Sequence, residues 1–359
     1  MSLILTADEE SLRDSVRRFV AERSPLSAIR ELAAAGEPYD AGVWKQLSAQ
    51  LGLAGLAIPE EYGGAGAGHA AMAVALQELG AGLVPSPLLA SAVLAAGTLL
   101  ALDDMAARAT VLAGIASGEV IATVALSGTA RAEHDAAAAR LTGELAPVLN
   151  GAQADVLLIP ADGPDGLRLY LVEAGADGLT RTPLAAVDPT RALARITLAG
   201  TPARALAGDA MVALRRAGDL ASLGLAAEQC GAMASCLAMT TEYAKLRVAF
   251  GQPIGAFQGV KHRLADMETA WELGHATLRA AARSADEDAA SFPADAAAAR
   301  VMISGPYFDA AENTILLHGG IGFTWEHDAH FFYKNALSGK VLLGGPAAQL
   351  DRLAAALGM

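Results

Sequence analysis

The sequence predicts an α+β protein: a helical N-terminal part, a small β-rich part, and long helices at the C-terminal end. Three observations predict this order. Helical periods run from Thr6 to about Ile115. Short apolar runs separated by Gly, Asp and Pro occupy the segment from about Gly118 to Thr201. From about Ala207 the chain returns to long Ala/Leu-rich helical patterns.

Length and composition agree with a folded protein of more than one domain. The chain has 359 residues, enough for two or three domains, and we expect their boundaries at 1–117, 118–203 and 204–359. Hydrophobic residues make up 53% and charged residues 18%, which is typical of globular proteins. The net charge of −13 disfavours nucleic acid and anionic membranes as partners, because both are negatively charged.

The N-terminal helices begin at a recognisable signal. Thr6 followed by Glu9 has the spacing of a capping box, which opens a first helix over Glu9–Arg23. Further helical periods cover Tyr39–Leu51, Met72–Leu83, Ser91–Leu102 and Met105–Gly118. The Gly-rich segment Gly63–Gly68 lacks a preceding strand and a following Lys-Ser/Thr pair, so it indicates a turn and not a phosphate loop.

We expect no membrane span and a cytoplasmic protein. Nothing ionisable occurs between Glu78 and Asp103, but Pro85 and Pro87 interrupt this run, and the remainder after Pro87 is shorter than the roughly 20 residues a spanning helix needs. The acidic start of the first helix does not fit a signal peptide. The two cysteines, at 230 and 236, lie on different faces of one helical pattern, so a disulfide is not expected and a reducing compartment fits.

The middle part is predicted to be a small sheet. Four short apolar runs have the length and composition of strands: Val120–Leu126, Asp155–Ile159, Leu167–Val172 and Ala194–Leu198. The Ala-rich segment Ala132–Ala139 is consistent with a short helix or a loop. In the C-terminal part, Asp286–Pro293 is the clearest break between helices.

A sharp corner between two C-terminal helices is the most informative stretch. It runs from Tyr243 to Met267 and reads Y-A-K-L-R-V-A-F-G-Q-P-I-G-A-F-Q-G-V-K-H-R-L-A-D-M. Two glycines and a proline end the first helix. Arg247 and Phe250 precede the corner, and Gln258 lies in the first turn of the next helix, where unpaired backbone N–H groups attract anions.

This corner resembles that of the acyl-CoA dehydrogenase family, flavoenzymes that desaturate acyl-CoA thioesters between Cα and Cβ. Two further segments are similar to the family's pattern, Ile58–Gly64 near the start and Leu317–Asp328 near the end, so the resemblance covers nearly the whole chain. It implies an N-terminal helical domain, a small middle β domain and a C-terminal four-helix bundle.

The resemblance also implies a FAD site shared between subunits, in which the ADP half reaches into a neighbouring chain. Arg247 matches the arginine that binds the pyrophosphate, a role suited to its planar cation. The other residues implied at the cofactor are Phe250, Gln258, Gly319, Gly320, Gly322 and Ser127. The family's glutamine two residues before His318 is Leu316 here, which removes one cofactor hydrogen bond.

The flavin-ring side and the catalytic base depart from the family. Pro147 and Leu149 stand where the family has the Trp and Thr that cover the ring, so we expect weak or absent FAD in the isolated chain. The glutamate base aligns with Gly344 in most relatives and with Ala221 in a minority, and neither can remove a proton. Glu228, two turns or about 10 Å beyond Ala221, is the remaining candidate base.

Three hypotheses for function fit the sequence. The first is a dehydrogenase-like subunit that supplies half of the FAD site to a second, catalytic dehydrogenase subunit, with acyl-CoA as substrate and an electron-transfer flavoprotein as acceptor. The second is an active homo-oligomeric dehydrogenase with an unrecognised base, and the third is a non-redox CoA-ester-binding protein. Glu326, His327 and His330 could suggest a metal, but a site needs more ligands than this pair of histidines offers, so we expect none.

Overall fold

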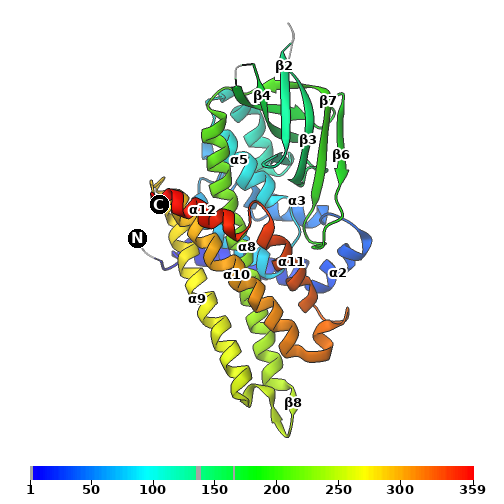
Figure 1. Ribbon diagram of the computed structural model, residues 1–359, viewed down its shortest axis with the longest axis vertical. Coiled ribbons are helices and arrows are strands. Elements are labelled where there is room, and N and C mark those ends of the chain that lie inside the picture. The colour runs from blue at the N-terminus through cyan, green and yellow to red at the C-terminus, as the bar shows by residue number, and fades with distance from the viewer. Residues whose placement is uncertain (1–2, 135–138, 165) are drawn as a thin grey trace.

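The structure is a computed structural model that describes residues 3–134, 139–164 and 166–359. Figure 1 shows the helices of the N-terminal part behind and beside a small sheet, with the three longest helices running away from both. This arrangement confirms the predicted α+β fold, with a helical domain, a β domain and a helical domain in chain order.

The N-terminal helices begin as the sequence predicts. Helix α1 (Ala7–Arg23) starts with the expected capping box, in which the Thr6 side chain accepts from Glu9 N and the Glu9 side chain accepts from Thr6 N. The remaining helices of this part are α2 (Leu26–Ala35), α3 (Ala41–Ala49), η1 (Leu53–Gly55), η2 (Glu60–Tyr62), α4 (Gly68–Ala81), η3 (Leu89–Ala95), α5 (Ala96–Leu100), α6 (Met105–Ala107), η4 (Arg108–Leu112) and α7 (Ala113–Ser117). Of these, α2, η1 and η2 were not predicted.

The β domain is larger than predicted. Its described strands are β1 (Ala122–Val124), β2 (Thr129–His134), β3 (Ala139–Leu149), β4 (Val156–Gly163), β5 (Gly166–Glu173), β6 (Leu179–Pro183) and β7 (Leu193–Ala205). Their order is β1-β4-β2-β3-β7-β5, with β6 beside β7, and a further β4–β5 pairing closes the sheet on itself. The helix or loop expected over Ala132–Ala139 is wrong in its described part, because Ala132 to His134 pair with β3; residues 135–138 lie outside the described residues.

The C-terminal domain is a bundle of long helices. It contains α8 (Ala210–Leu246), α9 (Gln258–Asp286), α10 (Phe292–His318), α11 (Ala329–Val341) and α12 (Pro346–Ala356). The predicted corner is the short hairpin of β8 (Val248–Ala249) and β9 (Gln252–Pro253), followed by η5 (Ile254–Ala256). The predicted break is confirmed, because α9 ends at Asp286 and α10 begins at Phe292.

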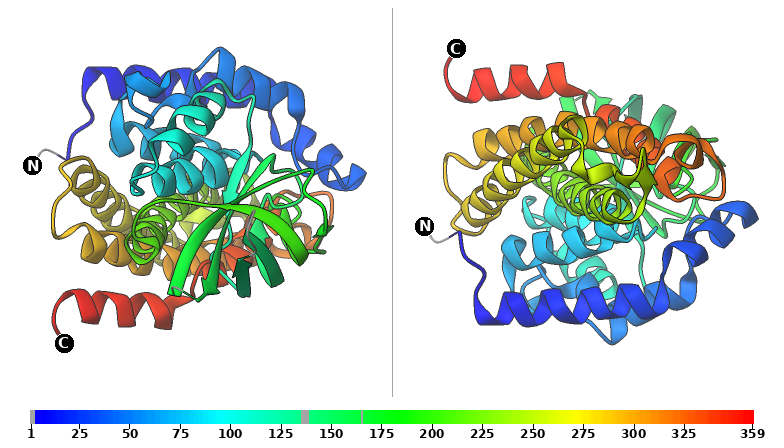
Figure 2. Two further views of the ribbon diagram at one scale, coloured as in Figure 1. Left: turned by 90° about the horizontal axis from the view of Figure 1, so that it is seen from above. Right: turned by 90° about the horizontal axis from the view of Figure 1, so that it is seen from below.

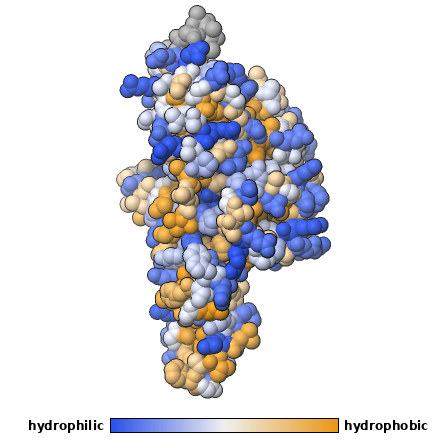
Figure 3. Space-filling model, turned by 90° about the vertical axis from the view of Figure 1, so that its right-hand side faces the viewer, coloured by the Kyte–Doolittle hydropathy of each residue, from blue (hydrophilic) through white to orange (hydrophobic). Residues whose placement is uncertain are grey.

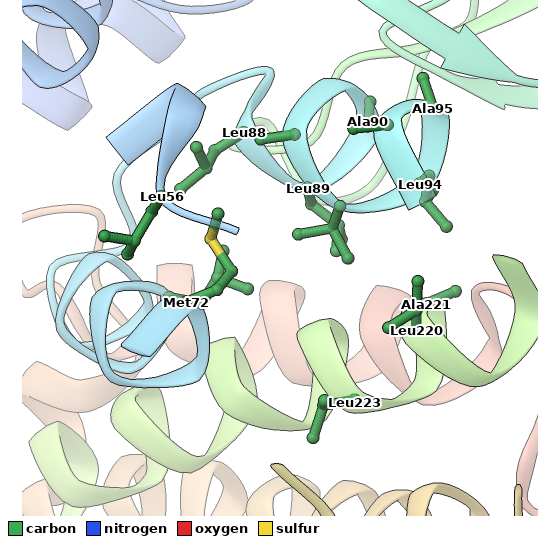
Figure 4. Packing of buried hydrophobic residues seen from close by; sticks show 14 of the residues in the cluster. Leu56, Met72, Leu88, Leu89, Ala90, Leu94, Ala95, Leu220, Ala221 and Leu223 are labelled. Carbon is green, nitrogen blue, oxygen red and sulfur yellow. The ribbon is translucent and has the colours of Figure 1, made fainter. Parts of the chain in front are cut away.

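The main core joins the N-terminal helices to α8. Figure 4 shows Leu89 of η3 pointing toward the side of α8 from which Leu220 and Ala221 project, with Met72 of α4 beside Leu88. Helix α8 is long and apolar enough to cross a membrane by length and composition, but 78% of its most apolar window is buried inside the molecule. It is therefore packed as the central helix of the core.

Candidate functional site

An open cleft lies along the first half of α8. Its volume is about 910 Å³, and its walls come from α8, the turn after β1, the connection between α9 and α10, the turn before α12 and the second half of α12. Ala221 and Gly344, the two positions at which the base was expected, both line it, and so does Ser127. The structure thus brings together residues more than 200 positions apart in the sequence, as the resemblance implies.

The backbone at Gly344 is unsuited to a residue with a side chain. Its φ is +97°, in the region that favours glycine, and the preceding Leu343 also has a positive φ of +57°. A Cβ at Gly344 would lie 3.2 Å from Nε2 of Gln349. Because the backbone here has a conformation that favours glycine, a glutamate at position 344 would be strained.

A partly buried ion pair between Asp219 and Arg352 lines the cleft, and the sequence alone did not reveal it. Arg352 of α12 donates to the carboxylate of Asp219 on α8 and, through Nη1, to Oγ of Ser222 at 2.9 Å. Gln349 closes the group, because its Oε1 accepts from Arg352 at 3.2 Å. Burial raises the pKa of Asp219, an effect that the Arg352 charge opposes. A lone acid within the apolar run of α8 was the signal that could have indicated such a pair.

Two further arginines line the wider part of the cleft. Arg216 lies over the ring of Phe292, 4.7 Å from its centroid, and donates to the carbonyl oxygen of Ala285. Arg215 is exposed and has no ion-pair or hydrogen-bond partner within the described parts of the chain.

Glu228, the candidate base from the sequence, does not line this cleft. Its carboxylate accepts a hydrogen bond from Arg191 at 2.7 Å, and both side chains are mostly buried. Burial alone would lower the pKa of Arg191, but Glu228 and Asp188 outweigh it and raise that pKa. Glu228 therefore lies beside a different, much smaller pocket, together with Asn335 and Asn150.

The Arg247 corner lies at the opposite end of α8. Arg247 is the C-cap residue of this helix and is exposed, and it has no ion-pair partner among the residues that the structure describes. Phe250 is 97% exposed with a positive φ of +51°, and Gln258 is exposed in the first turn of α9. Figure 1 shows this hairpin as the far tip of the molecule.

The segment Leu317–Asp328, called the glycine segment below, adjoins this corner. The ring of Tyr243, one turn before Arg247, stacks on His318 with centroids 4.3 Å apart, and its hydroxyl donates to the His318 carbonyl oxygen. Gly319 and Gly320 follow His318 and are exposed, whereas Gly322 is buried, and a Cβ there would meet the carbonyl oxygen of Ile315 at 2.5 Å. Arg247, Phe250, Gln258 and the exposed glycines thus lie at one end of the bundle.

One cofactor cannot use both ends of this chain. Ser127 and Ala221 line the cleft, and Arg247 lies 26 residues after Ala221 on the same helix, which is about 39 Å along its axis. A single flavin dinucleotide does not bridge that distance. The ADP-side residues and the cleft of one chain would therefore belong to two different cofactor sites.

The residues at the positions of the family's flavin-ring contacts are poorly suited to bind an isoalloxazine ring. Leu149 is buried in the main core, and its carbonyl oxygen accepts from the Thr123 hydroxyl at 2.6 Å. Pro147 is exposed and has no N–H to donate. The residues at the ADP-binding end fit a FAD, with an unpaired arginine and an accessible aromatic ring, whereas those at the ring end do not.

The histidines near the glycine segment make ring contacts. His327 lies 4.4 Å from the ring of His318, and His330 packs between Trp325 and Phe331. Within the described ranges, no group of three or more His, Cys, Asp or Glu side chains could hold a metal ion.

Comparisons with known proteins agree with this geometry. The acyl-CoA dehydrogenase N-terminal domain matches residues 6–119, and the acyl-CoA dehydrogenase C-terminal domain matches residues 211–358. The acyl-CoA dehydrogenase IpdE2 of Mycobacterium tuberculosis is 39% identical over 354 residues, which are 96% of each protein.

Solved structures of two heteromeric proteins are also similar. A chain of the ChsE4-ChsE5 complex from Mycobacterium tuberculosis has a TM-score of 0.93 and 32% identity over all of this chain and 99% of that one. A chain of the Tcur3481-Tcur3483 steroid ACAD G363A variant has a TM-score of 0.88 and 31% identity over 98% of both chains. The chain described here therefore belongs to the acyl-CoA dehydrogenase family.

Proposed function

We propose that this chain is the non-catalytic subunit of a heteromeric acyl-CoA dehydrogenase and completes the FAD site of a catalytic partner. One observation carries the proposal: the cleft has Ala221 and Gly344 at its two base positions, while Arg247, which matches the family's pyrophosphate-binding arginine, is exposed about 39 Å away at the far end of α8. A chain that has this exposed surface but no base can help to bind a neighbour's FAD. It cannot complete the dehydrogenation in its own cleft.

The exposed surface suits the phosphate end of FAD. The Arg247 guanidinium has donors free for two phosphate oxygens, and Phe250 presents a whole ring face to a partner. Exposed glycine backbone at 319 and 320 lets the chain approach the cofactor closely. When bound, FAD supplies the acceptor for the β-hydride, and the partner would supply the carboxylate that removes the α-proton.

The relatives suggest the substrate class and the setting. The similarity to IpdE2 and to a steroid ACAD supports a CoA thioester derived from steroid or fatty acid breakdown. We further propose that an electron-transfer flavoprotein reoxidises the partner's FAD. Both cysteines are buried and free, which suits a reducing compartment such as the cytoplasm.

The test is to express the chain alone and together with a family member that retains the base. We expect little flavin and no acyl-CoA oxidation from the chain alone, and a stable flavin-containing complex with turnover from the pair. In that pair, Glu228→Gln should leave turnover nearly unchanged. A stoichiometric flavin spectrum and turnover from the chain alone would refute the proposal.

A second candidate function is an active homo-oligomeric dehydrogenase. Asp219 favours it, because this carboxylate lines the cleft two residues before Ala221 and burial raises its pKa. The ion pair with Arg352, however, keeps the Asp219 carboxylate from acting as the catalytic base. Loss of turnover in Asp219→Asn, measured on the chain without any partner, would favour this second function.

A further inference from the structure

The glycine segment has little burial to hold it in place. Of the residues from Gly319 to Trp325, only Gly322 is buried. The aromatic side chains of Phe323 and Trp325 are 70% and 73% exposed. Segments with few buried contacts open readily, so the position of this one depends on individual hydrogen bonds.

Arg30 of α2 supplies three of these bonds. Its Nη1 donates to the carbonyl oxygen of Trp325, and its Nη2 donates to that of Glu326 at 3.0 Å and to Oδ1 of Asp328 at 2.6 Å. Figure 1 shows α2 beside the orange segment that leads into α11. One side chain of the N-terminal domain thus holds backbone that lies 295 positions later in the chain.

Helix α2 is a firm support for this side chain. Ile29, next to Arg30, is 2% exposed. Leu26 and Ala33, also on α2, pack against the buried cluster that includes Phe331 of α11. Because α2 packs against this cluster, Arg30 is held in a fixed place beside the end of the glycine segment.

The contacts use the shape of a guanidinium. Trp325 and Glu326 are consecutive, and their carbonyl oxygens accept from two different nitrogens of one planar group. An ammonium carries all its donors on a single nitrogen and cannot reproduce this arrangement. Asp328, the N-cap residue of α11, balances the charge. The three bonds therefore fix where the glycine segment ends and where α11 begins.

The other end of the segment is tied to the hairpin corner. Tyr243 of α8 stacks on His318 and donates to its carbonyl oxygen at 3.2 Å. Arg247 follows Tyr243 by one helical turn. The two exposed glycines of the segment lie between this tie and the Arg30 tie. With both ties present, these glycines keep a fixed position relative to Arg247.

Arg30 contributes little to the core of the protein. Its side chain is 36% exposed and that of Asp328 is 30% exposed. Water can therefore replace either partner when the other is removed. Loss of the Arg30 side chain should leave the fold intact and free the glycine segment.

From these contacts we infer that Arg30 is a positioning residue for the FAD of the partner subunit. By holding the carbonyl groups of Trp325 and Glu326, it keeps the exposed backbone at Gly319 and Gly320 in place for the ADP half of that cofactor. This role rests on the proposed function, because it concerns the same half-site. It adds the N-terminal domain to cofactor binding, through a residue that belongs to none of the sequence motifs.

Limited chymotrypsin digestion of the isolated full-length chain tests the Arg30 tie without flavin. The protease cuts after aromatic residues, and Phe323 and Trp325 lie in the segment. Cleavage there should be about tenfold faster in Arg30→Ala, because cleavage follows the population of the opened segment and a hydrogen bond to a charged group contributes about that factor. Arg18→Ala is the matched control and should not change cleavage, because Arg18 is exposed on α1 and has no hydrogen bond or ion pair with a described residue.

Titration of the flavin-free complex with FAD measures the effect on the cofactor. The chain is assembled with a family member that retains the base, and the dissociation constant of FAD is measured. This constant should rise about tenfold in Arg30→Ala, because reordering one backbone residue on binding costs about that factor. The sedimentation of the complex and the melting temperature of the isolated chain should not change. Arg30→Lys should recover only part of the affinity.

A second variant covers a failure of assembly. If Arg30→Ala shifts α2 and the complex does not form, Arg30→Met decides, because it keeps the aliphatic stem and removes every donor. An unchanged FAD dissociation constant, cleavage at the wild-type rate, or equal effects from Arg18→Ala would overturn the role of Arg30.

Arg247→Ala separates this role from the proposed function. If Arg247→Ala weakens FAD binding and Arg30→Ala does not, the half-site stands and only the role of Arg30 fails. If neither change weakens FAD binding, the half-site itself fails.

Discussion

At the scale of single residues, Glu9 has two structural roles at the N-terminus. Its carboxylate closes the capping box by accepting from Thr6 N, and it accepts from Arg283 of α9 at 2.6 Å, with Arg279 close by. Burial alone would raise the pKa of Glu9, but these hydrogen bonds and charges outweigh burial and lower the pKa. Glu9 thereby ties the first helix to the C-terminal bundle.

The lowered pKa makes this tie dependent on pH. Because the folded-state pKa lies below the unfolded value, the stabilisation is complete above the unfolded pKa of about 4.3 and is lost as the pH falls through the folded pKa. Glu9→Gln should lower the free energy of unfolding by about 1.5–3 kcal/mol at pH 7, and the difference from wild type should shrink at pH values below about 4.

Urea unfolding at both pH values measures this difference. Glu22→Gln is the control, because Glu22 lies on the same helix and is exposed. If Glu9→Gln lowers the free energy of unfolding by the same amount at pH 7 and at low pH, the charge of Glu9 is not what stabilises the fold.

At the scale of elements, α4 and α8 pack with their backbones in contact. A Cβ at Gly231 would lie 1.8 Å from the carbonyl oxygen of Gln77, and one at Gly80 would lie 2.0 Å from that of Glu228. Glycine costs helix stability in the middle of a helix, so its use at both positions reflects the close crossing. This crossing holds the N-terminal helices against the bundle and so fixes one wall of the core.

Gly231→Ala should therefore destabilise the protein despite the better helix propensity of alanine. We expect a loss of about 1–3 kcal/mol, because the helices must separate. Gly218→Ala on the same helix is the control: its Cβ would meet only Nη2 of Arg352 at 3.8 Å, so it should be neutral or stabilise by up to about 1 kcal/mol. Equal melting temperatures for the two variants would contradict the close-packing account.

Helices and strands with a strong local sequence pattern were predictable. Strands that form because they pair with a neighbouring strand were not. The capping box and the long helical periods located α1, α4 and α8. Strands β2, β3 and β6 were not predicted. Strand β2 is Ala- and charge-rich, β3 is interrupted by a glycine and a proline, and β6 has no buried residue along its length. Their strand character comes from pairing with β3 and β7, which a local pattern does not contain.

The same distinction applies to the site. Arg247 and the glycine segment were found because each stands in a local motif, and the structure adds that Tyr243 and His318 join them. Asp219 and Arg352 are 133 positions apart and belong to no motif, so only the packing of α12 on α8 reveals their pair. In the sequence, Glu228 was the nearest acid downstream of Ala221 on that helix face, but in the structure its carboxylate is paired with Arg191.

At the scale of the whole molecule, the long bundle separates two surfaces with different chemistry. Figure 2 shows α12, whose Arg352 and Ala355 line the cleft, at the edge of the bundle, away from the hairpin tip. The tip bears apolar side chains, with Leu246 78% and Val248 58% exposed in addition to Phe250. Figure 3 shows this apolar end in orange at the bottom of the molecule.

An exposed apolar tip with an unpaired arginine supports assembly with a second chain. Leu273 and the glycine-segment residues Phe323 and Trp325 are also exposed. Helix α9 buries few residues in its first half and has a polar outer face. The tip and glycine segment are therefore the stronger basis for proposing an oligomer.

Flavin occupancy of the complex carrying Arg247→Ala is the most direct test of the half-site proposal. The variant should fold normally, because the Arg247 side chain is exposed and has no ion-pair partner among the described residues. Charge-assisted bonds to phosphate contribute about 1.5–3 kcal/mol, so the FAD affinity of the complex should fall about ten- to hundredfold. Arg247→Lys should recover only part of it, since an ammonium lacks the planar fork. An unchanged flavin content in a correctly assembled Arg247→Ala complex would contradict the account.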